Sequence, residues 1–307
     1  MKTEQSVLKT SIAMTGLVAM TGILFGIFSG SGAIIFDGIY SLTDAIMTSV
    51  SLLVANLITA QLSEKRQEQL VKHFTMGFWH LEPIVLGLNA ILLTGSAFYA
   101  LVTAIGTLLS GGHDLDFGLA IGYTAVVVLI CIAMTVQNLR ANRQIQSDLV
   151  ALDAKGWMMA AALTGALLIA FIFGWLIRGT QFDWLVPYVD PAVLALVCLI
   201  VIPLPLPTIK QALADILLVT PPALKQQVDE VAARVVEREG FIDYRAYVAR
   251  VGRGRQIEIY FIVPANQPAQ PLEHWDGLRD IIGKELGEES PDRWLTIAFT
   301  TDLAWAE

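Results

Sequence analysis

Six apolar stretches, each long enough to cross a lipid bilayer as a helix, dominate this chain up to residue 207. A membrane-spanning helix needs about 20 predominantly apolar residues. The last stretch runs into Pro203, Pro205 and Pro207, which cannot continue a regular helix. The sequence therefore predicts an α-helical membrane protein, embedded in the lipid bilayer, with six transmembrane helices. They cover about residues 10–28, 34–60, 83–110, 117–139, 156–177 and 190–207.

The remainder of the chain has the mixed polar and apolar pattern of a soluble domain. Its helical and strand patterns follow the order αββαβ, which predicts a small α+β domain of ferredoxin-like, metallochaperone-like topology. The helices are expected at 223–239 and 272–286, and the strands at 244–251, 256–263 and 294–300. We therefore predict two domains, a six-helix transmembrane domain at residues 1–207 and a smaller domain at 208–307.

Lysine and arginine are distributed unevenly between the two sides of the predicted bundle. The loops of one side carry mainly aspartates, with Arg178 as the one basic residue near them. Basic loops remain in the cytoplasm, so we predict cytoplasmic N- and C-termini and a multi-pass protein of the plasma (inner) membrane. The basic side holds Lys2, Lys9, Lys65, Arg66, Lys72, Arg140, Arg143, Lys155 and Lys210.

Composition excludes several classes of protein. A net charge of −8 argues against nucleic acid as a partner. The two cysteines, Cys131 and Cys198, lie in apolar stretches and support neither a disulfide framework nor a thiolate metal site. The sequence holds no nucleophile–base set, phosphate-binding loop or His-Glu-x-x-His motif, so we do not expect an enzyme.

Two carboxylates lie inside the second apolar stretch, at Asp37 and Asp44. A charged side chain at the centre of a membrane helix costs about 2.5–3.5 kcal/mol on insertion scales, so such residues usually face the bundle interior. Asp37, Tyr40 and Asp44 are spaced i, i+3 and i+7, which places them on one helix face. Asn56, Asn89 and Gln137 are further polar residues in the stretches, for which we expect interhelical hydrogen bonds.

The chain resembles the cation diffusion facilitator family of proton-coupled divalent-metal exporters. The run from Ser29 to Asp44 matches that family's second-span signature, a Gly/Ser turn followed by a leading acid and a ligand pair, with Asp37 as the acid and Asp44 as the second ligand. Gly77 and Glu82 match the loop motif before the third span. Asp190-Pro191 and the segment 214–222 match as well. The resemblance implies efflux of a metal cation by antiport with protons, and a homodimer formed through the cytoplasmic domain.

The sequence also departs from the family pattern. Tyr40 replaces the first ligand of the second-span pair, and the fifth-span pair has two possible registers. In one register Asp153 is the first ligand and Trp157 takes the second position. In the other, which we prefer, Asp153 precedes the pair, and Gly156 and Ala160 take the ligand positions. The pair is incomplete in both.

The cytoplasmic domain departs from the family pattern too. Tyr260 and Thr300 stand at strand positions where members often have metal ligands, and Asp302 is the one acid left there. We therefore expect this domain to form a dimer without the help of a metal.

Asp44, Asp37, Asp153 and Tyr40 are the candidate metal ligands. Each has an alternative role: a structural buried acid for Asp44, a structural or proton-path acid for Asp37, helix packing for Tyr40, and a solvated helix start for Asp153. Oxygen ligands favour hard ions such as Mg²⁺ or Mn²⁺ over a typical zinc site.

The cation, Mn, Fe, Zn or similar, is expected as substrate, with no tightly bound cofactor. His80 and Glu82 could form either an interfacial ion pair or a second metal site. The alternative function is a family-derived protein that has lost transport and acts by binding or sensing through its cytoplasmic domain.

Overall fold

A computed structural model describes residues 4–61, 77–145, 148–287, 289–290 and 292–306. The chain forms two compact units. The first unit contains residues 1–50 and 88–209, and the second contains 51–87 and 210–307. The domain boundary after residue 207 stays a prediction. Lys65, Arg66 and Lys72, together with Phe74, Thr75 and Met76 of the loop motif, lie outside the described residues.

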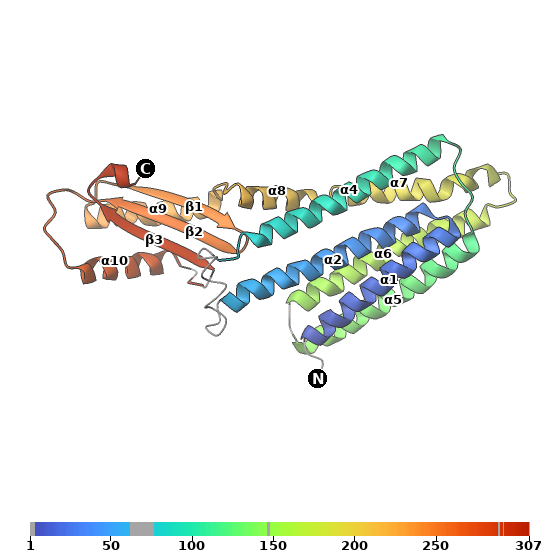
Figure 1. Cartoon of the computed structure of the whole chain (residues 1–307), viewed down its shortest axis with the longest axis horizontal. Coiled ribbons are helices and arrows are strands. Elements are labelled where there is room, and N and C mark those ends of the chain that lie inside the picture. The colour runs from blue at the N-terminus through green and yellow to red at the C-terminus, as the bar shows by residue number, and fades with distance from the viewer. Residues whose placement is uncertain (1–3, 62–76, 146–147, 288, 291, 307) are drawn as a thin grey trace. The chain divides into compact units, whose positions relative to one another are not determined.

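The described chain contains six segments that are long and apolar enough to cross a membrane, as predicted. Five of them are single helices, and the sixth, Asp183–Ile216, is interrupted. The single helices are α1 (Glu4–Ser29), α2 (Gly32–Gln61), α4 (Leu81–Leu109), α5 (Phe117–Ile145) and α6 (Asp148–Leu176) (Figure 1). The sixth segment begins with the 3-10 helix η2 (Asp183–Tyr188) and α7 (Val189–Val201).

The proline cluster interrupts the sixth segment but does not end it. Helix α7 ends at Val201, and a turn over 202–205 leads into α8 (Leu206–Ile216), a helix that the sequence analysis did not predict. Pro207 lies in the first turn of α8. The backbone N–H groups of a first turn have no acceptor within the helix, so a proline there costs no helical hydrogen bond.

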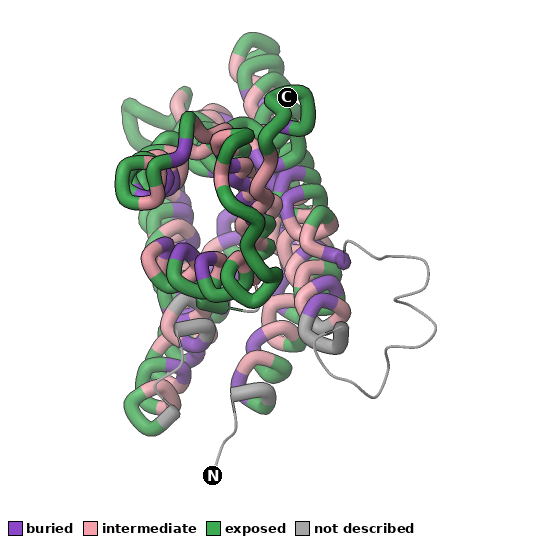
Figure 2. The backbone as a smooth tube through the Cα atoms, turned by 90° about the vertical axis from the view of Figure 1, so that its left-hand side faces the viewer, coloured by how far each residue is buried: buried purple, intermediate pink, exposed green. Residues whose placement is uncertain are grey.

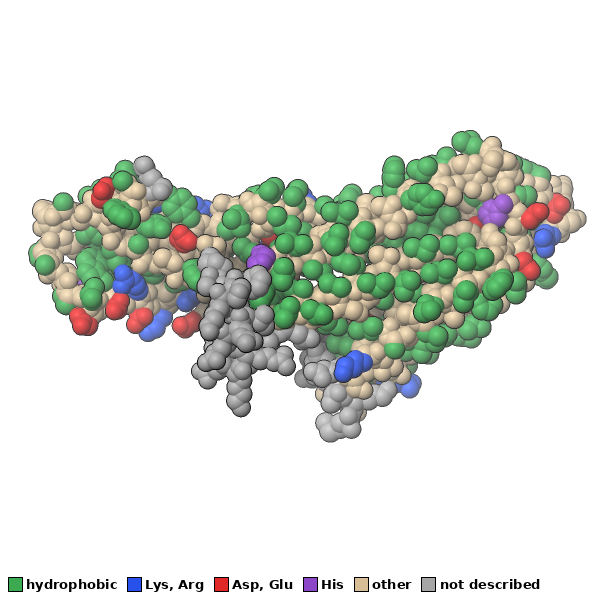
Figure 3. Space-filling model, viewed as in Figure 1, with side chains coloured by type: hydrophobic (Ala, Val, Ile, Leu, Met, Phe, Trp, Pro, Cys, Tyr) green, Lys and Arg blue, Asp and Glu red, His purple; other side chains and the backbone are tan. Residues whose placement is uncertain are grey.

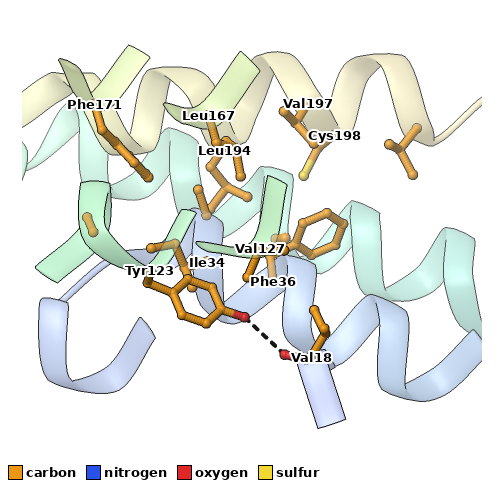
Figure 4. Close-up of a cluster of buried hydrophobic side chains, with 14 of the residues drawn as sticks. Val18, Ile34, Phe36, Tyr123, Val127, Leu167, Phe171, Leu194, Val197 and Cys198 are labelled. Atoms are coloured by element: carbon orange, nitrogen blue, oxygen red, sulfur yellow. Dashed lines mark hydrogen bonds between the residues drawn. The ribbon is translucent and has the colours of Figure 1, made fainter. Parts of the chain in front are cut away.

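The helices of the first unit expose apolar side chains and bury a shared core. Phe98, Tyr99 and Leu109 are 60%, 74% and 84% exposed, which suits contact with lipid. Figure 3 shows hydrophobic side chains over most of the visible face of these helices. Inside, the core includes Phe171 and the Tyr123 ring, whose hydroxyl donates to the Val18 carbonyl at 3.0 Å (Figure 4).

Helices α1 and α2 approach closely at glycines. A Cβ at Gly38 would lie 2.8 Å from the Ile23 nitrogen and 2.9 Å from the Ala19 oxygen of α1. Gly22 and Gly26 of α1, four residues apart, face the same contact, in the spacing typical of close membrane-helix pairs. These glycines therefore hold the acid-bearing helix α2 tightly against α1.

The second unit contains the predicted αββαβ order. Its elements are α9 (Pro222–Glu239), β1 (Asp243–Val251), β2 (Gly254–Ile262), α10 (Leu272–Glu285) and β3 (Arg293–Thr300). The sheet has the order β1-β2-β3, with β1 antiparallel and β3 parallel to β2 (Figure 1). Gly240, at φ +69°, ends α9 in the left-handed conformation that glycine tolerates.

Helices α9 and α10 cover one face of the sheet. Ile257, Ile259 and Phe261 alternate along β2 and are buried together with α9 and α10 side chains such as Val231 and Ile282. Figure 2 shows buried and exposed positions alternating along the helices. The predicted layering is therefore confirmed.

Candidate cation site

Helix α2 carries three of the four candidate ligands. Asp37, Tyr40 and Asp44 are all half-buried on this helix, in the first unit. The α2 backbone is regular from Gly32 to Gln61, so no Pro or break disturbs their spacing.

Asp44 has a polar partner on a neighbouring helix. Asn89 of α4 donates from Nδ2 to Asp44 Oδ1 at 3.4 Å, which is long for a hydrogen bond and therefore weak. The other end of this amide, Asn89 Oδ1, is buried and accepts no hydrogen bond from the residues that the structure describes. The interhelical bond expected for Asn89 exists, and it leaves an unsatisfied oxygen beside a carboxylate.

Tyr40 and Asp37 differ in their surroundings. The Tyr40 ring packs against the main core, in agreement with the helix-packing role considered for it. Its centroid lies 5.6 Å from that of the Phe36 ring, and the two ring planes make an angle of 51°. The Asp37 carboxylate accepts no hydrogen bond from any described side chain or backbone group. An acid with no donor inside a helix bundle is costly as an anion, so a proton is its natural partner.

Asp153 belongs to a different hydrogen-bond network. It lies on α6, and its Oδ2 accepts a 2.6 Å bond from Asn138 Nδ2 of α5. Ser11 of α1 also interacts with this carboxylate and accepts a 2.5 Å bond from the Trp157 indole. Neither Asn138 nor Ser11 was predicted from the sequence. The signal available was a polar side chain within an apolar stretch, which Asn138 shares with its neighbour Gln137.

The structure supplies no second ligand for either register of the fifth-span motif. An indole N–H is only a donor, and that of Trp157 is used by Ser11, so Trp157 cannot bind a metal. Gly156 and Ala160, the positions of the other register, have no ligating atoms. The choice of register stays a prediction.

The candidate acids do not converge on one metal centre. Among the residues that the structure describes, no three His, Cys, Asp or Glu side chains are placed to hold a metal ion. Asp44 pairs with α4, whereas Asp153 pairs with α5 and α1. A four-ligand site of the family type is therefore not assembled from these residues.

A fully buried acid lies beside the first turn of α2. Asp190, only 2% exposed, accepts bonds from Ser31 Oγ (2.5 Å) and from the Gly32 and Ala33 nitrogens (2.9 and 3.4 Å). His113 Nε2 lies 3.4 Å from its Oδ2. The carboxylate thus caps the first turn of α2 from the start of α7, a favourable position for a negative charge.

In the second unit, Glu82 forms an ion pair. It accepts bonds from the Arg253 backbone nitrogen (3.1 Å), Nε (3.0 Å) and Nη2 (3.2 Å), and this raises the pKa of Arg253. His80 instead lines a cavity of about 210 Å³ with residues that include Trp79, Leu218 and Trp294. The ion-pair role expected for Glu82 is present, and no bond joins it to His80 among the described contacts.

The tail positions that replace family ligands are engaged in ordinary hydrogen bonds. Tyr260 lies 3.5 Å from Glu258, and Thr300 Oγ1 accepts from the Asp302 nitrogen at 3.1 Å. Asp302 in turn accepts from the Ala304 nitrogen at 3.0 Å. These contacts stabilise the chain end and leave no cluster of ligands in the described part of the tail.

Comparison with known proteins gives the family. The chain matches the model of the cation efflux transmembrane domain over residues 8–217. It is 26% identical over 196 residues to the "Metal cation efflux system protein CzcD" of Cupriavidus metallidurans and to the "Cation efflux system protein CzcD" of Alcaligenes sp. strain CT14. Each match covers 64% of this chain, and the chain spans 56% of each relative.

The family match extends over the six apolar segments and both acid-bearing helices, α2 and α6. The match explains why the sequence shows no catalytic motif, because this is a family of transporters and not of enzymes. On these grounds the chain is a multi-pass integral membrane protein that belongs to the cation efflux family.

Proposed function

We propose that this protein exports a divalent metal cation from the cytoplasm across the plasma (inner) membrane in exchange for protons. Family membership supports efflux, and the names of the two relatives describe metal cation or cation efflux systems. The observation that carries the proposal is the Asp44–Asn89 pair, which combines a half-buried carboxylate with an unsatisfied amide oxygen inside the helices.

The donor set favours a hard cation. Carboxylate and amide oxygens suit Mg²⁺ and Mn²⁺ better than the imidazole and thiolate sets typical of Zn²⁺. A buried acceptor without a partner costs about 1–3 kcal/mol, and a cation beside Asp44 would satisfy Asn89 Oδ1 once the amide turns over. The long 3.4 Å bond that this turn would break costs little.

We assign proton binding during the transport cycle to Asp37. It lies seven residues before Asp44 on the same helix, a rise of about 10 Å, and has no hydrogen-bond donor among the described residues. A carboxyl group there can accept a proton on one side of the cycle and release it on the other without disturbing a structural bond. The cation and the proton would then share α2.

The orientation and the assembly are part of the same proposal. Lys9, Arg140, Arg143 and Lys155 lie near the start of α1, the end of α5 and the start of α6, which supports a cytoplasmic location for that end of the first unit. We assign homodimer formation to the second unit, without a metal, because its described residues hold no metal-ligand cluster.

Transport into proteoliposomes with an imposed pH gradient tests the proposal. Uptake of Zn²⁺, Mn²⁺, Fe²⁺, Co²⁺, Cd²⁺ and Mg²⁺ would be measured for the full chain, with Asp44→Asn as the test variant. We expect gradient-dependent Mn²⁺ uptake that falls at least tenfold in Asp44→Asn. Asp114→Asn makes the same charge change on an exposed loop and should transport like the wild type.

The alternative is a family member that has lost transport and acts by binding or sensing through its tail. The dispersed acids and the indole of Trp157 at a ligand position favour it. If no ion crosses with the wild-type protein, or Asp44→Asn transports as well as the wild type, the export proposal is wrong. A tail that dimerises only after metal addition would contradict the assembly assigned to it.

A further inference from the structure

We propose that His113 and Asp190 form a pH-dependent latch at the end of the first unit where α1 and α2 meet. A protonated His113 binds the Asp190 carboxylate and holds the loop between α4 and α5 against the starts of α2 and α7. Loss of the proton weakens this end of the unit. In the orientation proposed above, the latch faces away from the cytoplasm and responds to the pH on the far side of the membrane.

The Asp190 carboxylate has one acceptor position to spare among the described residues. Two carboxylate oxygens offer about four such positions. Oδ1 accepts from the Ser31 hydroxyl and the Ala33 nitrogen, and Oδ2 accepts from the Gly32 nitrogen. The fourth position is on Oδ2, which lies 3.4 Å from His113 Nε2. A proton on Nε2 therefore completes the set and displaces none of the three existing hydrogen bonds.

His113 contributes a buried nitrogen that lacks a hydrogen bond. Its Nε2 atom is enclosed and makes no hydrogen bond with the described residues, although it lies within ion-pair distance of Asp190. Buried polar atoms normally have a partner. Without a proton Nε2 is an acceptor that faces another acceptor, whereas a protonated imidazole donates from both nitrogens. Protonation thus turns an unsatisfied contact into a charge-assisted hydrogen bond.

The two side chains differ in their access to solvent. The His113 side chain is 30% exposed, so a proton can reach its ring, whereas that of Asp190 is 2% exposed. Histidine is the type of side chain that changes charge between about pH 5 and pH 8. The stabilisation is present while the imidazole is charged and is lost as the pH rises and the proton leaves.

The loop that carries His113 connects several helix ends. The His113 nitrogen donates to the Pro187 carbonyl at 3.1 Å, and the Asp116 nitrogen donates to the Ser29 carbonyl at 2.9 Å. Gly112 has a φ of +81°, and a Cβ there would lie 2.4 Å from the Pro187 oxygen. The loop is thus fixed between the end of α1 and η2, which leads directly into α7. Opening the latch therefore loosens all these helix ends together.

The other titratable or charged side chains near this end have different contacts. Asp116 accepts from the Leu119 nitrogen at 3.1 Å, and Asp183 accepts from the Gly179 nitrogen at 2.9 Å. The segment 26–36, where α1 ends and α2 begins, contains no charged residue. Among the described acids, Asp190 is the one in ion-pair contact with His113. The other groups are Asp114, Asp116, Arg178, Asp183 and Tyr188.

Hydrogen–deuterium exchange of the full chain in lipid nanodiscs, at about pH 5.5 and about pH 8, tests the latch. Exchange rates are corrected for the intrinsic pH dependence of amide exchange. We expect the backbone protection of segments 29–36 and 112–118 to be at least about threefold higher at the lower pH. His113→Gln keeps a polar side chain that cannot be charged and should remove this difference. His274→Gln makes the same exchange at an exposed histidine of the second unit and should retain it.

A second variant tests the partner of His113. Asp190→Asn keeps the shape of the side chain and removes its charge, so it should also remove the pH dependence. If this variant does not fold, His113→Gln decides the question alone. The latch is wrong if the wild type and His113→Gln show the same pH dependence, or if protection falls at the lower pH. A pH dependence that persists in Asp190→Asn would equally overturn the pair.

The latch and the export proposal have separate outcomes. Asp44→Asn should show the wild-type pH dependence of protection, because Asp44 does not contact the latch. If protection follows the charge of His113 in a protein that moves no cation, the latch stands and the export proposal fails. If the wild type transports Mn²⁺ and His113→Gln leaves protection unchanged at both pH values, the latch alone fails.

Discussion

Asp190, which contacts the first turn of α2, differs in its hydrogen-bond partners from Asp44 and Asp153. Asp190 receives a serine hydroxyl and two backbone nitrogens and lies beside His113, so its carboxylate is fully used. Asp44 and Asp153 each receive an asparagine N–H whose amide oxygen remains unsatisfied. Burial of an acid in a membrane helix therefore does not by itself indicate a cation site. The number of hydrogen bonds that the carboxylate itself accepts is the better indicator, three at Asp190 and one at Asp44 among the described residues.

The largest effect should come from removing the satisfied acid. Asp190→Ala leaves Ser31 and the first N–H groups of α2 without their acceptor and removes the carboxylate beside His113, which should lower the free energy of unfolding by about 3 kcal/mol. Thermal or SDS unfolding in detergent would measure it. Asp114→Ala, an exposed acid on the neighbouring loop, should change stability by less than about 0.5 kcal/mol. Equal losses in the two variants would remove the structural role from Asp190.

Asn89→Leu should affect transport far more than stability. It removes a buried oxygen that has no described partner, but it also removes the one donor that Asp44 has among the described residues, so the free energy of unfolding should change by less than about 1 kcal/mol. Mn²⁺ transport should fall at least tenfold because the cation loses an oxygen ligand. A variant that is less stable and transports normally would show that Asn89 is merely structural, as Asp190 is.

The smallest effect should come from an acid whose partner is partly exposed. Glu82 and Arg253 have side chains 25% and 37% exposed, and water screens their attraction. Glu82→Gln should lower the free energy of unfolding by about 0.5 kcal/mol and leave Mn²⁺ binding unchanged. The same measurement in high salt should shrink the difference further. A tenfold loss of Mn²⁺ binding would instead place Glu82 with the cation-site acids.

Much of the fold could be predicted from the sequence because hydropathy and turn chemistry are local. The six apolar stretches, the αββαβ tail and the left-handed end of α9 at Gly240 follow from residues within a few positions of each other. Helix α8 was missed because Pro203, Pro205 and Pro207 predict an end of helix, whereas the first turn of a new helix accepts proline.

The candidate site was predictable on one helix only. The spacing of Asp37, Tyr40 and Asp44 follows from helix geometry, and an interhelical bond was the natural expectation for Asn89. Asn138 carried the same signal as its neighbour Gln137, a polar side chain within an apolar stretch, but its partner Asp153 on another helix could not be predicted. Ser11 gave no signal, because a serine near the chain start is an ordinary residue when read along the sequence.

What the sequence determined by itself is which segments enter the membrane, which residue types lie in them and which of those share a helix face. Only the tertiary structure decided which acids have complete partners. Ser31 and Asp190 are 159 positions apart, and Ser11 and Trp157 are 146 apart, so no local pattern connects them. Contacts between helices depend on how their surfaces pack. Small residues such as Gly38 permit a close contact, but the helical periodicity of a sequence does not specify which helix will be the partner.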